Sequence, residues 1–445
     1  MRPSCFLLFA AASVAAVTHA RSAACAEPAP PLPAAPPAAA ASEPAPAAGA
    51  ETPPTPPGST PAPPIAAPPP AWGPPSFASD PLGAVASAAD LTLKMYGDTG
   101  YAIRDHANQP WPTAMSNPNV YAPGVWNSFF APRLDLFGSA DVSRLAFLTE
   151  VMFEGLGNNI GVDIERIQVT YLVANWLRLR AGRSHLAFGY YNDTYHHGNF
   201  FELTTSRPYS VNFEDSCGII MSHNVGAGFD GTVDVGGAGS IRYDFDVGNG
   251  RAADVTAVAL QYAETNPKSV NLRLRWMPID GLILGVNGMR DVIPPLASPT
   301  AMIPNRPTTE ELVAGAHAVY TENHVLLDIE GFAMRHNPDG APSTSITGGF
   351  AEVGYTIGSV TPYFRAEYIH FPSSGDIIFQ FTSNSAEGAL VGYQAIYTGF
   401  DSFTDLRAGF KWVALPQLAV KLEVERLGRD AMDQEIATVK VAFGF

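Results

Sequence analysis

The chain has 445 residues and a formal net charge of −16, and charged residues make up only 15% of it. An acidic chain with few, scattered lysines argues against nucleic-acid binding. Its three cysteines cannot build a disulfide framework, and their spacing matches no zinc site. Beyond the first residues there is no run of about 18 apolar residues, which argues against transmembrane helices.

Residues 1–26 have the features of a secretory signal peptide. A positively charged start is followed by an apolar run over residues 5–17. Cleavage after Ala20 or after Ala26 would satisfy the small-residue rule, and both remain open. A lipid anchor on Cys25 is the rival interpretation, but the residues before it lack the usual Leu. The sequence therefore predicts export.

Residues 27–87 are rich in Pro and Ala and contain almost no charged or aromatic residues. Proline fixes an extended backbone and removes hydrogen-bond donors, so this composition predicts a disordered periplasmic linker before the folded domain. The linker is either an inert tether or a spacer that contacts the cell wall.

From residue 88 the sequence changes to strands separated by polar connections that alternate in length. We expect short connections at 138–141, 174–176, 235–239, 278–281, 321–324, 357–359 and 414–417. We expect longer ones at 105–128, 155–160, 190–222, 249–267, 292–309, 336–345, 372–402 and 428–434. Short turns at one end and long loops at the other are typical of an outer-membrane barrel. The sequence therefore predicts an all-β fold over residues 88–445, a closed antiparallel transmembrane β-barrel of about 16 strands.

Within the predicted strands, apolar and polar residues alternate with the two-residue period of a strand. Leu272, Leu274 and Trp276 fall on one face, for example, and Arg273 and Arg275 on the other. In a soluble sandwich the polar face would point to water and the apolar face to a core. In a membrane barrel the apolar face meets lipid and the charged face meets the lumen.

The last strand alternates through Ala437, Val439 and Val441 and ends on Phe445. A terminal Phe on such a strand resembles the ending of bacterial outer-membrane barrels, which favours the membrane interpretation. The strands at 282–291 and 310–320 alternate poorly, and the sequence leaves their register open.

The polar face of the predicted strands is the candidate pore lining. It is nearly balanced in charge, so opposed basic and acidic patches could create a transverse field that favours polar solutes. The other interpretation is that the charges pair and merely solvate the interior. The pore-lining candidates are Arg133, Arg144, Arg178, Arg180, Arg242, Arg273, Arg275, Arg365, Arg407, Lys411, Lys421, Lys440, Asp328, Glu330 and Glu423.

The connection at 190–222 is the candidate constriction loop, because it is among the longest and follows the fifth strand. The residues around its start and centre, Arg180–Arg183, Gly189–Asn192 and Arg207-Pro208, resemble the Gly-Arg … Phe-Gly … Asn … Arg-Pro pattern of phosphate-selective-type porins. In that family the third long loop folds into the lumen, and basic residues set a preference for anions.

The resemblance extends to few individual positions. It implies Arg183 and Arg207 as basic residues of the constriction, with Tyr190 and Asn192 as supports. The Lys-rich arrangement of the family is missing, and Glu202 and other acidic residues add negative charge to the loop. Phosphate selectivity is therefore not implied.

Other motifs lead to no chemistry. His196 and His197 are adjacent, so on an extended chain they point apart and make a poor metal site. Residues 226–231 match G-x-G-x-x-G, but a dinucleotide site needs a following helix, and a strand follows here. Cys217 is expected to be a small apolar residue. No catalytic constellation is present, and no cofactor or metal is expected.

The sequence thus predicts a porin in the outer membrane of a Gram-negative bacterium, surrounded by lipid. It would be a passive diffusion channel for small hydrophilic solutes, anionic ones among them, and the resemblance implies a homotrimer. The alternative is a structural or adhesive barrel linked to the cell wall without transport. An enzyme inside a barrel is the third and weakest interpretation.

Overall fold

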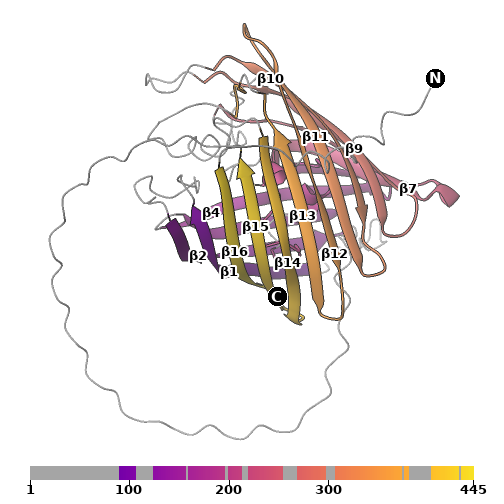
Figure 1. The fold of residues 1–445 in the computed structure, drawn as a ribbon. Coiled ribbons are helices and arrows are strands. Elements are labelled where there is room, and N and C mark those ends of the chain that lie inside the picture. Colours follow the sequence, from indigo (N-terminus) through magenta and orange to yellow (C-terminus); the bar gives the residue numbers. More distant parts are fainter. Residues whose placement is uncertain are drawn as a thin grey trace, which may run out of the picture. The chain divides into compact units, whose positions relative to one another are not determined.

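The fold is a single closed barrel of antiparallel strands (Figure 1). Our computed structural model describes residues 90–106, 124–156, 159–195, 199–212, 219–253, 268–296, 306–372, 375–379, 402–429 and 432–445. These described residues form sixteen strands: β1 (Asp90–His106), β2 (Gly124–Val142), β3 (Leu145–Leu156), β4 (Asn159–Ala174), β5 (Leu177–His185), β6 (His223–Asp234), β7 (Ser240–Gly248), β8 (Ser269–Met277), β9 (Leu282–Ile293), β10 (Thr309–Tyr320), β11 (Val325–Pro338), β12 (Thr344–Tyr355), β13 (Val360–His370), β14 (Ser402–Leu415), β15 (Leu418–Arg429) and β16 (Met432–Gly444).

Each strand pairs with its neighbours in sequence, and β1 pairs with β16 to close the sheet. At the seam the backbone nitrogen of Met95 lies 3.0 Å from the carbonyl oxygen of Phe445, and the reciprocal bond is 2.8 Å. Closure leaves no unpaired strand edge, which is what a sheet in an apolar solvent requires. The predicted all-β closed barrel of about 16 strands is confirmed.

The connections at one rim are short turns, at 143–144, 175–176, 235–239, 278–281, 321–324, 356–359 and 416–417. These match the predicted turns, except that β2 continues through Val142 and moves the first turn beyond 138–141. At the opposite rim the strand ends are separated by longer stretches of sequence, which span residues 107–123, 186–222, 249–268, 294–308, 339–343 and 371–401.

Several connections at the long-loop rim are shorter than predicted, two of them by most of their length. β3 and β4 remain paired up to Leu156 and Asn159, and β15 and β16 up to Arg429 and Met432. The predicted loops at 155–160 and 428–434 are therefore mostly strand, because polar residues near a barrel rim look like loop in sequence.

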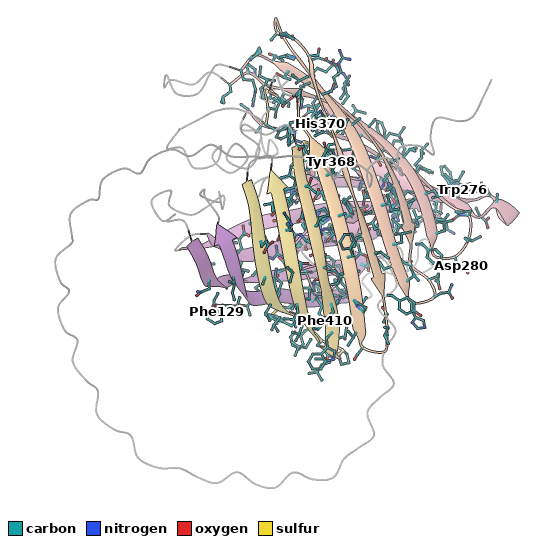
Figure 2. All side chains as sticks on the ribbon, in the orientation of Figure 1. Phe129, Trp276, Asp280, Tyr368, His370 and Phe410 are labelled. Carbon is teal, nitrogen blue, oxygen red and sulfur yellow. The ribbon has the colours of Figure 1, made fainter. Side chains whose placement is uncertain are left out.

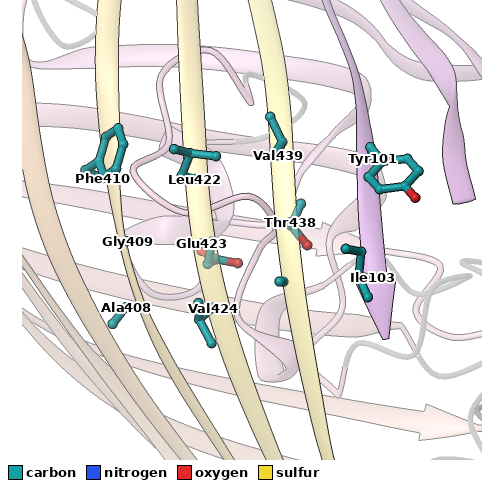
Figure 3. A pocket seen from close by; sticks show the side chains of 11 residues that line it. Tyr101, Ile103, Ala408, Gly409, Phe410, Leu422, Glu423, Val424, Thr438 and Val439 are labelled. Carbon is teal, nitrogen blue, oxygen red and sulfur yellow. The ribbon is translucent and has the colours of Figure 1, made fainter. Parts of the chain in front are cut away.

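The outer face carries the apolar half of the alternation, as β8 illustrates. Leu272 and Trp276 are 46% and 45% exposed, whereas Arg273 between them is fully buried. Figure 3 shows another part of the outer face, where Phe410 and Leu422 line a shallow apolar groove across β14, β15, β16 and β1. Among the described residues no helix is long and apolar enough to cross a membrane.

The composition of the two faces of β9 and β10 explains why the sequence left the register of these strands open. Their outward positions include Gly288, Ala314 and Ala316, which are exposed, and their inward positions include the buried Met289 and Val313. Small residues on the outside and large apolar residues on the inside weaken the alternation.

An apolar cluster fills part of the barrel interior, where we expected a polar face throughout. The inward residues of β9–β15 pack there against the connection between β5 and β6. Its members are Leu186, Phe188, Tyr191, Tyr209, Val211, Ile219, Ile220, Met221, Met289, Ile293, Val313, Phe332, Met334, Ile346, Phe350, Ile369, Phe371, Ile378, Phe379, Phe403 and Leu427. Burying this surface stabilises the connection inside the barrel by the hydrophobic effect.

The predicted signal peptide (1–26) and linker (27–87) lie outside the described residues. So do Cys217 and the pair His196-His197.

Candidate functional site

The candidate site is the inner face of the barrel together with residues 186–222, which we call the internal loop. The loop leaves the end of β5 and returns at the start of β6, and its described residues are 186–195, 199–212 and 219–222. It contains two single-turn helices, α2 (Tyr191–Thr194) and a 3-10 turn at Tyr209–Val211. The described residues of the loop contain little regular secondary structure, so the position of the loop depends on contacts with the wall.

Wall carboxylates bind backbone N–H groups of the internal loop. Glu330 on β11 accepts hydrogen bonds from the backbone nitrogens of Tyr190 and Tyr191, at 3.0 and 2.6 Å. Glu423 on β15 accepts from the backbone nitrogen of Thr205 at 3.0 Å and from its hydroxyl at 2.5 Å. A carboxylate is a strong acceptor, and it satisfies donors that would otherwise be buried without a partner.

A third carboxylate acts in the same way, since Glu367 on β13 accepts from the backbone nitrogens of Tyr209 and Ser210, both at 2.7 Å. Wall cations bind loop carbonyls in turn. Lys421 on β15 donates to the carbonyl oxygen of Thr204 at 2.7 Å and also to that of Asn199. Both charge signs on the wall therefore hold the loop backbone.

Arg365, Arg273 and their loop partners extend this pattern. Arg365 on β13 donates to the carbonyl oxygens of Ser206 and Arg207, at 2.9 and 3.2 Å. Arg273 on β8 donates to the carbonyl oxygen of Gly189 at 2.5 Å. These two arginines are fully buried beneath the loop, so their charge serves the loop and is shielded from the interior water.

Arg273 also pairs with Asp193 in α2, at 2.6 Å. Burial raises the pKa of the Asp193 carboxyl, but the guanidinium groups of Arg273 and Arg275 together outweigh burial and hold that pKa below its ordinary value. Nearby, burial raises the pKa of Tyr190 to about 12, so its hydroxyl is neutral. The start of the internal loop thus carries one ionised carboxylate, Asp193, which is paired with Arg273 on the wall.

The residues predicted for the constriction occupy different places. Arg183 lies on β5, where its Nε donates to the carbonyl oxygen of Glu165 at 3.0 Å. Asn192 is buried and donates to the carbonyl oxygens of Leu186 and Met221, at 3.2 and 3.0 Å. These two carbonyls belong to opposite ends of the internal loop, so Asn192 ties its ends together.

Arg207 is only 4% exposed and is bound within the loop itself. It donates to the carbonyl oxygens of Val211 at 2.9 Å and Tyr195 at 3.0 Å, and to the side-chain oxygen of Asn192 at 3.3 Å. Its guanidinium also lies over the ring of Tyr191, 5.3 Å from the centroid. Arg207 and Asn192 therefore act as internal cross-links, and Tyr190 binds the wall through its backbone.

The opposite wall, on β2, β4, β5 and β7, presents arginines to the interior. We call Arg133, Arg166, Arg178, Arg180, Arg183 and Arg242 the arginine wall. Their side chains are 12% to 25% exposed, whereas the carboxylates that they face are at most 8% exposed. In each of these ion pairs the guanidinium group is more exposed to the interior than its carboxylate, so the arginines are the more accessible charges of the pairs.

Asp244 on β7 shows the excess of arginine at the edge of this wall. Its carboxylate lies 3.9 Å from Arg180, 3.5 Å from Arg242, 3.1 Å from Arg273 and 3.3 Å from Arg275. Arg180, Arg242 and Arg273 also pair with Asp246, Asp230 and Asp193. With Arg178, which pairs with Asp230, the cluster holds five guanidinium groups and four carboxylates, so it carries an excess of positive charge.

A glycine allows the arginine wall to cross a strand. Gly228 on β6 is the register partner of Arg180 on β5 and of Asp246 on β7. Because Gly228 has no side chain, Arg180 reaches across β6 to Asp246, at 2.7 Å. A Cβ atom at Gly228 would lie 2.5 Å from the Asp246 carboxylate and 3.2 Å from Arg180 Nε.

The fifteen pore-lining candidates thus fall into distinct groups. Arg133, Arg178, Arg180 and Arg242 belong to the arginine wall. Arg275 binds Asp244, and Lys440 binds Asp98 at 3.2 Å. Asp328 is fully buried, and Arg144 lies in the exposed turn between β2 and β3. The residues that contact the internal loop are Arg273, Arg365, Arg407, Lys411, Lys421, Glu330 and Glu423.

Sequence reasoning missed Arg166 because β4 contains a bulge. The register between β3 and β4 shifts after Glu150, so Glu165 and Arg166 both face inward between the exposed Ile164 and Ile167. The signal in the sequence is a pair of polar residues between apolar ones, where strict alternation would have only one. Arg166 pairs with Glu150 at 2.5 Å.

No group of three or more His, Cys, Asp or Glu side chains within the described ranges is arranged to hold a metal ion. The Gly226–Gly231 match lies on β6, where its backbone pairs with β5 and β7 as an ordinary strand.

The sequence matches no protein-family model and no curated protein. The fold is similar to solved structures of outer-membrane proteins. An anion-selective porin from Comamonas acidovorans aligns with a TM-score of 0.52 at 11% identity, over 80% of this chain and all of that one (100%). The outer membrane channel DcaP of Acinetobacter baumannii aligns with a TM-score of 0.53 at 10% identity, over 81% and 98% of the two chains. The trimer form of OmpT of Vibrio cholerae has a TM-score of 0.50 at 10% identity, over 80% and 99%. At such low identity these likenesses establish the fold.

Proposed function

We propose that the protein is a porin of the outer membrane of a Gram-negative bacterium. Small hydrophilic solutes would diffuse passively through the water between the internal loop and the arginine wall. The apolar outer face and closed backbone fit a lipid surrounding, and all three similar structures are outer-membrane proteins.

We further propose that the channel prefers anions. The observation that carries this proposal is the difference in exposure between the guanidinium groups of the arginine wall and the carboxylates that they pair with. A solute in the channel meets the exposed charge at close range, and a narrow passage between low-dielectric walls strengthens that field. The similar porin from Comamonas acidovorans is described as anion-selective, which supports the same direction.

The internal loop would set the size limit. Its backbone is bound to β8, β11, β13 and β15 by charged side chains, and an apolar cluster packs beneath it. These contacts confine solutes to the side of the interior that faces the arginine wall. A homotrimer is the proposed assembly, in line with the trimeric OmpT structure, and contact of the linker with the cell wall remains part of the proposal.

Ion conductance in planar lipid bilayers tests this function. The wild-type protein should insert with stepwise openings, and its reversal potential in a KCl gradient should indicate anion preference. Arg242→Gln removes the most exposed charge of the arginine wall and should lower the anion-to-cation permeability ratio by about twofold. Arg426→Gln, which removes an outward-facing charge on β15, should leave the ratio unchanged.

Two outcomes would contradict the proposal. A correctly folded barrel that conducts no ions would favour the structural or adhesive alternative. Equal permeability ratios in the wild type, Arg242→Gln and a triple variant lacking Arg178, Arg180 and Arg242 would show that the arginine wall does not set ion preference.

A further inference from the structure

Outward-facing basic residues of the barrel lie near its long-loop rim. Within the described side chains of the strands, they are Arg290 on β9, Arg335 on β11 and Arg426 on β15. All three strands run towards the long-loop rim and end at Ile293, Pro338 and Arg429, so each arginine lies three residues before the last residue of its strand. In an outer-membrane barrel this rim faces the cell exterior. An arginine on the lipid face is costly at mid-membrane and well tolerated only near the interface.

Arg290 and Arg335 belong to one local arrangement. Both are paired in register with Leu312 of β10, which lies between them, so their backbones are about 10 Å apart. The Nε of Arg290 donates to Glu310 at 2.8 Å, and the Nε of Arg335 donates to Asn337 at 2.9 Å. The amide of Asn337 completes the arch by donating to Glu310 at 3.1 Å.

This arch orients two guanidinium groups and leaves their outer nitrogens available. Among the described residues, each guanidinium makes its side-chain hydrogen bond through Nε, and the Nη groups of Arg290 and Arg335 make none. The Arg290 side chain is 52% exposed. Paired guanidinium groups with unused N–H donors match the oxygens of a phosphate ester.

The surface directly below the two arginines is flat and apolar. The next outward row towards the membrane centre is Gly288, Ala314 and Ala333, all exposed, and the row after it is Val286, Ala316 and Gly331. Small side chains on adjacent strands form a shallow seat that acyl chains can cover. Tyr368 and His370, labelled on the outer face of β13 in Figure 2, lie near the same rim.

We propose that Arg290 and Arg335 bind the phosphate of a phosphorylated glycolipid in the outer leaflet, whose acyl chains lie on the Gly/Ala surface below. The inference rests on the outer-membrane placement proposed above and does not depend on conduction. Positive charge at the rim complements the phosphate, and the apolar seat complements the lipid tails.

Native mass spectrometry of the whole protein in detergent, with purified lipid A added, tests the site. The wild type should retain lipid A, and the double variant Arg290→Gln/Arg335→Gln should bind it about tenfold more weakly. Arg144→Gln, which removes an exposed arginine at the opposite rim, should bind lipid A as the wild type does. Dephosphorylated lipid A should bind the wild type about as weakly as intact lipid A binds the double variant.

Equal binding of lipid A by the wild type and the double variant would overturn the proposal, and so would equal binding of the dephosphorylated lipid. The circular dichroism spectrum and thermal unfolding of the same double variant should match those of the wild type, which shows that the barrel is folded. A barrel that binds lipid A but does not conduct would refute the channel and leave the lipid site standing.

Discussion

The carboxylate of Glu423 on β15 binds Thr205 in the internal loop twice, at the backbone nitrogen (3.0 Å) and at the hydroxyl (2.5 Å). The two residues are 218 positions apart in sequence. Glu330 and Glu367 bind the loop in the same way, so three charges placed on the inner face of the barrel hold the backbone of the internal loop.

Truncating Glu423 should therefore loosen the loop more than truncating Thr205. Glu423→Ala leaves a buried N–H without its acceptor, at a cost of about 1–3 kcal/mol, whereas Thr205→Ala removes only the hydroxyl bond, worth about 1 kcal/mol. Amide hydrogen exchange over residues 199–212 should accelerate in that order. Glu322→Ala, in an exposed turn at the other rim, serves as the control. Equal exchange in all three variants would show that the wall carboxylates do not anchor the loop.

A side chain at Gly228 should break the ion pair between Arg180 and Asp246. Gly228→Val places atoms where the guanidinium crosses β6, and we expect a loss of about 1–3 kcal/mol in the free energy of unfolding. Urea unfolding of the refolded barrel measures the loss. Gly237→Ala lies in an exposed turn with no atom within 4 Å of the new Cβ and should be neutral. A neutral Gly228→Val would contradict the close approach.

Asn192 should be needed to keep the two ends of the internal loop together. Leu has a similar volume to Asn, but Asn192→Leu leaves the carbonyl oxygens of Leu186 and Met221 without their donor. Each unsatisfied carbonyl should cost about 1–3 kcal/mol of stability. We expect faster proteolysis within residues 186–222, while the β-sheet content measured by circular dichroism stays unchanged. Proteolysis at the wild-type rate would show that Asn192 is not needed to hold the two ends of the loop together.

The contact between Asp193 and Arg273 should make the start of the loop sensitive to acid. Because the folded pKa of Asp193 lies below its unfolded value of about 3.9, the pair contributes stability above that value and loses it as the pH falls through the lower folded pKa. The protection factors for amide exchange at residues 190–195, which correct for the intrinsic pH dependence of exchange, should fall on acidification below about pH 4. Asp193→Asn should lack this pH dependence, and an unchanged pH profile in that variant would exclude Asp193 as its origin.

The sequence by itself determined the barrel. Leu272 and Trp276 alternate with Arg273 and Arg275, and a two-residue period is a local property that assigns each residue to a face. The alternation of short and long connections likewise follows from the order of turn residues along the chain. Closure and strand number could therefore be predicted without knowing any long-range contact.

Only the tertiary structure decided what covers each part of the inner face. Arg242 and Arg273 have equivalent places in the alternation, yet Arg242 meets interior water and Arg273 lies beneath the internal loop. Met334 and Phe350 are apolar residues at inward positions, and they are buried there because the loop packs on them; the bulge in β4 turns Arg166 inward. Periodicity specifies a face, but the partner on that face comes from a segment far away in sequence, whose path depends on burial and hydrogen bonds formed only in the folded barrel.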